Sequence, residues 1–544
     1  MLSYRKLAMR VLGRPLHTEG IDSPRPASQR AAAFALTAAM LITLTAPAFA
    51  ETWYIENGDI TVKASGTEGK NTVSQGNKKD VEDTNTIITG TSDENTVIID
   101  TSKGNVDVTF DDLNIDASSR KEAAMSVTGS GNTTIKLDGD NHLTGGNGSS
   151  GIDSIGSLTI YGGENDSLTA QGGSGADGSG GDGIHSGSLT ISGGTVNANG
   201  GNGGDGNYSD GGSGIRISSR SLTVSGGTVT ANGGNGAVGS GGDGIFSFDH
   251  VTISGGSTVT ANGGNGGSLV GGDGIRSGGG LTVSDGTVTA KGGNGDSKDG
   301  YGGDGIRSGG GVTISGNTVN AAGGYGGKVG GYGICSFDRV AISGGTVEAA
   351  GGNGSTGGGS GIYSSVIDLS GSLELTAKAG SPNGKALSQK GSELVLDTIK
   401  DKLGPGAKVT ATDADGKVID QVSTPRPVEP EESSSSSDGG SPPPSAPASP
   451  LPGLTVTDKD GQRISYTSTQ SGNTLTVCVG RFTASFRISL AALRQLRAEG
   501  IKTIAFQTIL CSTTLSVDEL LAMGSEDAEA VLTHRFTDSS LTVG

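Results

Sequence analysis

Residues 181–201 read GDGIHSGSLTISGGTVNANGG, and close variants of this stretch recur along much of the chain. The Gly-Ile step returns every 28 to 32 residues, with its isoleucine at Ile152, Ile184, Ile215, Ile245, Ile275, Ile306, Ile334 and Ile362. Two further stretches follow each step, and both alternate apolar with polar residues, which is the period of a strand with one buried face. Each repeat therefore predicts three short strands.

The apolar positions keep the same order in every repeat. Four more columns follow the isoleucines: Leu189, Leu222, Val251, Leu281 and Val312; Ile191, Val224, Ile253, Val283 and Ile314; Val196, Val229, Val259, Val288 and Val319; and Ala198, Ala231, Ala261, Ala290 and Ala321. One repeat cannot bury its own apolar face, whereas a stack of repeats forms a continuous core. The repeats therefore predict an all-β fold, a parallel β-helix (β-solenoid) over residues 51–420 with about ten or eleven coils.

Glycine makes up 101 of the 544 residues, and much of it lies in loops such as 200–213 and 292–303. Because every repeat inserts its loop at the same corner, we expect the loops to form one ridge. Glycine at such corners indicates a positive φ or a close approach of two backbones. Asparagines recur in these loops and predict a structural hydrogen-bond ladder; they are Asn202, Asn235, Asn265 and Asn294.

The first fifty residues have the pattern of a signal peptide. Basic residues such as Arg5 and Lys6 precede an apolar stretch over 31–47 and the small-x-small site Ala48-Phe49-Ala50. We expect cleavage before Glu51 and a secreted or cell-surface protein with no membrane insertion afterwards; an uncleaved anchor is the alternative. The formal net charge of −18 argues against nucleic acid as a partner.

The C-terminal part of the chain has a different composition. A Ser-rich acidic run and Pro-Pro-Pro predict a disordered linker over residues 421–452. Residues 453–544 predict a small α/β domain with helices over 489–499 and 516–523. We expect this domain to serve interaction or attachment, with an unknown protein partner. Cys478 and Cys511 pair if they lie close; in the alternative, they and Cys335 are small apolar core residues.

Three motifs together point to a known family. They are Asp-Gly-Ile, then Leu-Thr-Ile-Ser-Gly-Gly, then Thr-Val-Asn-Ala-Asn, as in residues 182–199. Over roughly residues 85–380 the chain resembles the carbohydrate-binding β-helix family first described in clostridia. The resemblance implies a right-handed parallel β-helix similar in fold to polysaccharide lyases, bound calcium, and affinity for cell-wall glycans, acidic ones included. This chain departs from the family in its long glycine loops and in repeats that lack the aspartate.

An aspartate precedes the Gly-Ile step in several repeats. In adjacent coils such carboxylates lie about 5 Å apart and repel each other, which favours a compensating cation. Calcium suits carboxylate and loop carbonyl oxygens. We therefore predict calcium as the cofactor, with the metal ligands Asp182, Asp243, Asp273 and Asp304. In the alternative, each aspartate caps its own turn by accepting backbone N–H groups.

The residue after each isoleucine points outward by strand alternation. This outward column also contains His185 and Cys335, and its predicted carbohydrate-binding residues are Arg216, Phe246, Arg276, Arg307 and Tyr363. Guanidinium groups suit the carboxylates of uronic acids, and aromatic rings offer apolar faces to sugars. In the alternative, the arginines pair with nearby aspartates such as Asp273 and Asp304.

The sequence contains no set of residues that we recognise as catalytic. It lacks the clustered aspartates with His and Arg-x-Lys that pectin hydrolases use, and His occurs only five times. We therefore predict a non-enzymatic protein that binds cell-wall or acidic polysaccharide along the β-helix. The alternatives are a structural or adhesive surface rod with a protein partner, and a polysaccharide lyase in which Arg276 or Arg307 removes a proton.

Overall fold

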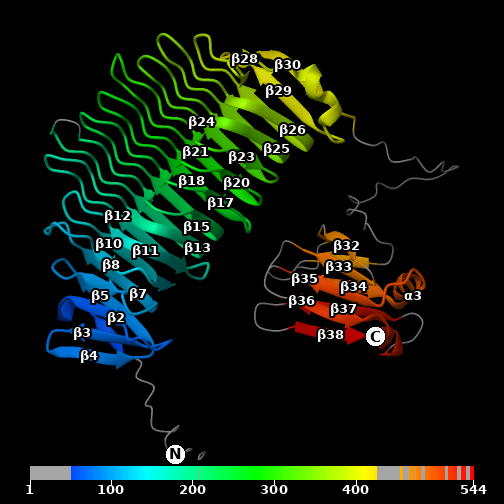
Figure 1. Ribbon diagram of the computed structural model, residues 1–544, viewed down its shortest axis with the longest axis horizontal. Coiled ribbons are helices and arrows are strands. Elements are labelled where there is room, and N and C mark those ends of the chain that lie inside the picture. Colours follow the sequence, from blue (N-terminus) through cyan, green and yellow to red (C-terminus); the bar gives the residue numbers. More distant parts are fainter. Residues whose placement is uncertain are drawn as a thin grey trace, which may run out of the picture. The chain divides into compact units, whose positions relative to one another are not determined.

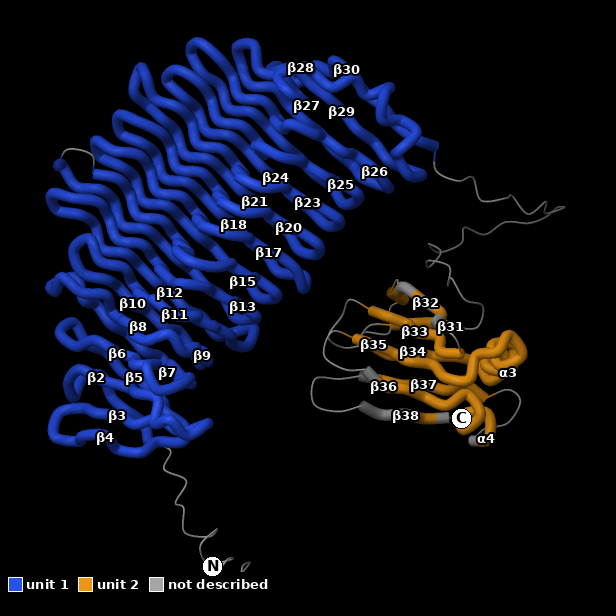
Figure 2. The backbone as a smooth tube through the Cα atoms, viewed as in Figure 1, with its two compact units in different colours: residues 1–428 blue, residues 429–544 orange. Residues whose placement is uncertain are grey.

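The structure is a computed structural model. It describes residues 51–206, 209–425, 454–457, 463–464, 466–471, 473–479, 484–508, 512–523, 528–534 and 539–543. The predicted signal peptide and residues 426–452 of the predicted linker lie outside these ranges. The chain forms two compact units, residues 1–428 and 429–544, and each is described by itself (Figure 2).

The first unit is a β-solenoid of about 13 turns, which confirms the predicted fold class (Figure 1). The expected ten or eleven coils were too few, because the first coils are irregular. Their strands are β1 (Thr52–Tyr54), β2 (Ile60–Ala64), β3 (Asn71–Gln75), β4 (Lys78–Asp83), β5 (Thr86–Ser92), β6 (Val97–Asp100), β7 (Val106–Asp116), β8 (Met125–Thr128), β9 (Asn132–Asp138), β10 (Asp140–Thr144), β11 (Ile152–Tyr161) and β12 (Ser167–Gln171), with a short 3-10 helix η1 (Ile55–Asn57).

The regular repeats occupy the middle of the solenoid. Their strands are β13 (Ile184–Asn199), β14 (Ile215–Ile217), β15 (Leu222–Asn232), β16 (Ile245–Ser247), β17 (Val251–Ile253), β18 (Ser257–Asn262), β19 (Ile275–Ser277), β20 (Leu281–Val283), β21 (Gly286–Lys291), β22 (Ile306–Ser308), β23 (Val312–Ile314), β24 (Thr318–Ala322), β25 (Ile334–Ala350) and β26 (Ile362–Lys378). Strands pair in parallel with their counterparts in the next coil, so Ile245 is opposite Ile275 and Val259 opposite Val288. All five predicted apolar columns lie in one continuous buried core.

Antiparallel hairpins cover both ends of the stack. Strands β2, β3 and β4 form an antiparallel sheet at the N-terminal end, where the indole of buried Trp53 donates to Asp83 Oδ2 over 2.8 Å. The C-terminal end contains β27 (Leu387–Gln389), β28 (Ser392–Glu393), the 3-10 helix η2 (Leu396–Lys402), β29 (Lys408–Thr412) and β30 (Val418–Ser423). Strand β30 pairs antiparallel with β29 and extends slightly beyond the predicted boundary at residue 420. The hairpins leave fewer open strand edges for aggregation.

The glycine loops line up along one side of the solenoid, as expected (Figure 1). In the loop that begins at Gly200, the N–H groups of Gly200 and Gly203 bond to the loop of the next coil. Those of Gly201 and Gly204 bond instead to the returning arm of the preceding loop. A bonding period of three residues is that of the polyproline II helix, whose backbone has no hydrogen bonds of its own to use. The loops are therefore a bonded lattice of extended arms.

Most glycines of the loops lie so close to the backbone of a neighbouring arm that a side chain would not fit. A Cβ added to Gly264 would lie 1.9 Å from the Gly234 carbonyl oxygen, well inside van der Waals contact. In the regular repeats, the positive-φ glycines lie at another corner, between the second and third strands, as at Gly194 and Gly227 (φ 76° in both). The predicted asparagine ladder is confirmed, because each side chain accepts the backbone N–H of the next, as Asn235 Oδ1 does from Asn265 over 2.8 Å.

The second unit contains two four-stranded sheets, in the orders β31-β34-β37-β38 and β32-β33-β35-β36. Their strands are β31 (Leu454–Thr457), β32 (Thr467–Ser471), β33 (Thr474–Cys478), β34 (Ala484–Ser489), β35 (Thr503–Gln507), β36 (Ser512–Ser516), β37 (Glu529–His534) and β38 (Ser539–Val543). Both predicted helices are present as α3 (Leu490–Ala498) and α4 (Val517–Met523). Ser489 caps α3 by accepting the Ala492 N–H over 3.2 Å.

Two sequence expectations concern groups that the structure describes only in part. Cys335 and Cys478 are free thiols, whereas Cys511 lies outside the described residues, so their pairing stays a prediction. Among the helices in the described ranges, none has the length and apolar character needed to span a membrane.

Candidate functional site

The four predicted aspartates form a ladder on the returning arms of the glycine loops. The carboxylates of Asp182, Asp243, Asp273 and Asp304 each accept one backbone N–H from the equivalent position of the next coil over 2.7 Å. The ladder fixes the spacing of adjacent coils as the asparagine ladder does. The alternative to metal binding is correct in that each aspartate accepts a backbone N–H group. That N–H group belongs to the next coil, however, and not to the aspartate's own turn.

Burial changes the charge of this ladder. Desolvation, and then repulsion from Asp273, raise the pKa of Asp243 to about 7 and that of Asp304 to about 8. Desolvation also raises the pKa of Asp182 and of Asp273. Near neutral pH, part of the ladder is therefore protonated, while the guanidinium groups beside it stay charged. The surface around these arginines is therefore more positive than it would be if every aspartate of the ladder were ionised.

The arginines of the outward column stack on aromatic rings. The guanidinium carbons of Arg216 and Arg276 lie 5.0 and 5.7 Å from the centre of the Phe246 ring, which they flank from neighbouring coils. Arg307 lies 5.4 Å from the ring centre of Phe337. Cation–π contacts of this kind hold a guanidinium in one orientation and are worth about 0.5–1 kcal/mol each at exposed sites.

Ion pairs with the ladder account for only part of the arginine charge. Arg307 lies 3.4 Å from an Asp304 oxygen, and Arg216 is at the limit of contact with Asp182, 4.0 Å away. Within the described ranges, Arg276 makes no such ion pair. The predicted alternative of local pairing is therefore correct for Arg307, marginal for Arg216 and absent for Arg276.

The column changes character toward its C-terminal end. Tyr363 stacks on Tyr332 with ring centres 5.0 Å apart, so one face of the Tyr363 ring is covered. The expectation that alternation turns every side chain of the column outward is wrong at Cys335, which is 2% exposed. Its burial raises the pKa of the thiol to about 12, so the thiol is not a reactive nucleophile. At the other end, a 2.8 Å hydrogen bond to Asp153 raises the pKa of His185.

The strands that carry Arg276 and Arg307 are each followed by a corner without side chains of its own. In their two coils the next corner consists of glycines, Gly278–Gly280 and Gly309–Gly311. Phe248 and Phe337 occupy this corner in the flanking coils, and they are 66% and 56% exposed. Three coil spacings separate the two rings, or about 14 Å. The coils of Arg276 and Arg307 therefore lie between two coils that each carry an exposed ring at this corner.

The described residues contain no group of three or more His, Cys, Asp or Glu side chains placed to hold a metal ion. Calcium takes six to eight oxygen ligands, whereas the ladder is a single file of carboxylates, each already bonded to an N–H group. The ladder alone does not match that requirement. Calcium binding stays a prediction for solution measurement.

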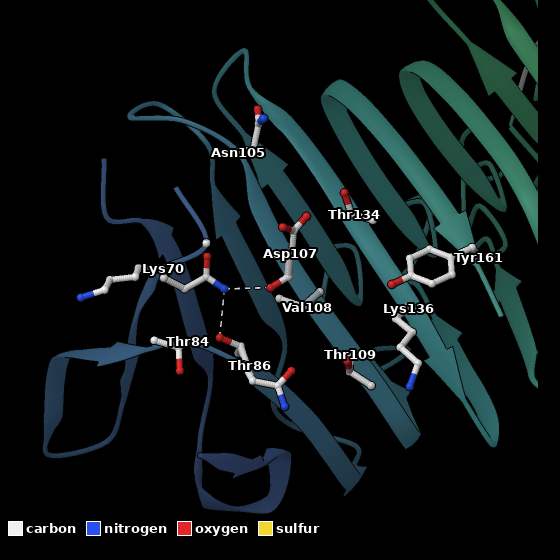
Figure 3. A pocket seen from close by; sticks show the side chains of 13 residues that line it. Lys70, Thr84, Thr86, Asn105, Asp107, Val108, Thr109, Thr134, Lys136 and Tyr161 are labelled. Atoms are coloured by element: carbon white, nitrogen blue, oxygen red, sulfur yellow. Dashed lines mark hydrogen bonds between the residues drawn. The ribbon is translucent and has the colours of Figure 1, made fainter. Parts of the chain in front are cut away.

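The sequence reading missed a cleft at the N-terminal end of the solenoid (Figure 3). It has a volume of about 380 Å³ and lies where the turn between β2 and β3 and the start of β5 meet the outer face of β7, β9 and β11. Its lining includes Asp107, Thr134, Lys136 and Tyr161. The polar positions of these strands are visible in the sequence. Which of them lie side by side depends on the register between the coils, and the sequence analysis did not predict that register.

No protein-family model, curated protein or solved structure matches the chain.

Proposed function

We propose that the β-solenoid binds acidic polysaccharide outside the cell and has no catalytic activity. The observation that carries this proposal is the Arg216–Phe246–Arg276 stack on one outward column of strands, followed in the same column by Arg307, which lies against Phe337 at the next corner. Oriented guanidinium groups bind carboxylates through paired hydrogen bonds. Their repeat at the coil spacing suits a polymer that carries an acid group at regular intervals.

The electrostatics of the ladder favour an anionic ligand. Raised pKa values at Asp243 and Asp304 leave the neighbouring arginines only partly compensated near neutral pH. Phe246 is covered on both faces by guanidinium groups, so its role in this proposal is to hold Arg216 and Arg276 rather than to stack on sugar. Exposed Phe248, together with the free face of Tyr363, supplies the sugar contacts.

The test is affinity electrophoresis through gels that contain polygalacturonate. The Arg276→Gln/Arg307→Gln double variant should lose most of the retardation of the parent protein, and its control is Arg120→Gln, which removes an arginine paired with Asp59 and Glu122. Equal retardation of the double variant and the parent would contradict the proposed site. Formation of unsaturated, ultraviolet-absorbing uronides during incubation would contradict the absence of catalysis.

Secretion is part of the same proposal and has its own test. The predicted leader ends at the small-x-small site Ala48-Phe49-Ala50. We expect the protein in the culture medium or on the cell surface, with Glu51 as its N-terminal residue by peptide sequencing. Recovery in the cytosol with the leader attached would contradict it.

A protein-binding rod is the second candidate, and one observation favours it. Exposed apolar side chains follow the tips of successive glycine loops, at Val238, Leu269, Val270, Tyr301 and Tyr325. Contiguous exposed apolar side chains are typical of protein contact surfaces. Cross-linking on intact cells should then give a protein adduct that Leu269→Ser/Tyr301→Ser loses, whereas the arginine double variant keeps it.

A further inference from the structure

The N-terminal cleft is built on two outward columns of the irregular first coils. Strand pairing places Asp107 beside Thr134 in one column, and Thr109, Lys136 and Tyr161 in consecutive coils of the other. This face belongs to the second strand of each coil, whereas the arginine column belongs to the first. The cleft is therefore separate from the surface that carries the proposed polysaccharide site.

The opposite side of the cleft is held rigidly by the N-terminal hairpin. Buried Asn71 donates from Nδ2 to Thr86 Oγ1 over 3.0 Å and to the Asp107 carbonyl oxygen over 2.8 Å (Figure 3). These two hydrogen bonds connect β3 with β5 and with β7. A cavity of about 380 Å³ is within the range of small-ligand sites, and sites of that kind are usually preformed. The ligand should therefore need little rearrangement of the protein.

Charge around the cleft argues against an anion. Lys70 lies 3.7 Å from Glu82, and Lys136 lies 3.3 Å from Asp138, so both lysines at the cleft are paired. Asp107 is exposed and, in the part of the chain that the structure describes, has no ion-pair partner. Its carboxylate is an acceptor for hydroxyl groups, and Thr109 and Thr134 add hydroxyls that donate and accept.

An aromatic ring completes the lining. Tyr161 stands at the end of the cleft away from the hairpin and is 41% exposed (Figure 3). A tyrosine ring offers a flat apolar face together with a polar edge, which matches the C–H face and the hydroxyl edge of a sugar ring. We propose that this cleft binds a neutral sugar, with Tyr161 against its apolar face and Asp107 accepting its hydroxyl protons.

The test is saturation-transfer NMR on the full protein with three neutral probes: cellobiose, maltose and diacetylchitobiose. At least one probe should give a signal, and Tyr161→Ala and Asp107→Ala should each weaken its binding by about tenfold, which corresponds to the loss of one good contact. Tyr161→Phe should keep binding, because it keeps the ring. The matched controls are Tyr54→Ala and Asp177→Ala, which remove exposed side chains outside the cleft.

Two outcomes would overturn the proposal: no signal from any of the three probes, or a signal that survives the Tyr161→Ala/Asp107→Ala double variant. Unchanged melting of each variant shows that a lost signal reflects the cleft and not unfolding. The Arg276→Gln/Arg307→Gln variant should keep the disaccharide signal. Its behaviour distinguishes failure at the cleft from failure of the proposed acidic-polysaccharide site.

Discussion

Replacing Asp273 by Asn should stabilise the solenoid at alkaline pH and leave it unchanged in acid. Asp273 is 6% exposed and lies between Asp243 and Asp304 in the ladder, where its Oδ1 accepts the Asp304 N–H over 2.7 Å. An amide oxygen accepts the same bond, so Asp273→Asn keeps the ladder and removes one buried charge. Because desolvation raises the pKa of Asp273, the folded protein must give up a tightly held proton as the pH rises.

The sign follows from proton linkage. A carboxyl group whose folded pKa lies above its unfolded value of 3.8 binds more protons when folded, so stability falls as pH rises between the two values. For Asp243 that window runs from 3.8 to about 7, and for Asp304 from 3.8 to about 8. One pKa unit corresponds to about 1.4 kcal/mol, so the rise of the Asp243 pKa from 3.8 to about 7 costs the ionised folded state on the order of 4 kcal/mol, and Asp273→Asn removes the part of that cost that comes from repulsion by Asp273.

Calorimetric melting at pH 3 and pH 8.5, below and above the titration window, measures this effect. The melting temperature of Asp273→Asn should equal that of the parent at the lower pH and exceed it by several degrees at the higher pH. Asp177→Asn is the matched control, because this aspartate is exposed and lies outside the ladder. A variant that melts at or below the parent temperature at pH 8.5 would refute the reasoning, since the buried charge would then be stabilising.

Three further predictions concern packing, core and metal. Gly264→Ala places a Cβ 1.9 Å from the Gly234 carbonyl oxygen and should lower the melting temperature strongly, whereas Gly178→Ala, with no atom within 4 Å, should change it little; equal effects would contradict the close-packed loop lattice. Ile275→Ala empties a fully buried position of the isoleucine column and should cost about 2–5 kcal/mol in urea unfolding, against a negligible cost for exposed Ile98→Ala. If calcium binds the folded protein, chelator should lower the melting temperature and added calcium should restore it; identical melting curves would remove calcium from the proposal.

The fold was predictable because its strands repeat. A side chain such as Val259 has the same neighbours in every coil, so alternation and spacing alone fix its burial against Val288. The number of coils was not predictable in the same way. Near the N-terminus, the two-residue period persists, as in β7, but the distance from one coil to the next varies and hides the register. The cleft beside Asp107 depends on that hidden register, and it was therefore missed.

The candidate site shows a different limit, because its chemistry depends on contacts across coils. The sequence places Arg216, Phe246 and Arg276 in one outward column, but alternation cannot show that the two guanidinium groups cover both faces of the ring. It cannot show either that the aspartates bond to the next coil and become hard to ionise. In the site that we propose, these two features act together: partly protonated carboxylates leave the arginine charge less compensated, and the stacked ring holds the guanidinium groups of Arg216 and Arg276 in place. A ladder that stabilises the coils thereby also sets the charge of the face that we propose to bind polysaccharide.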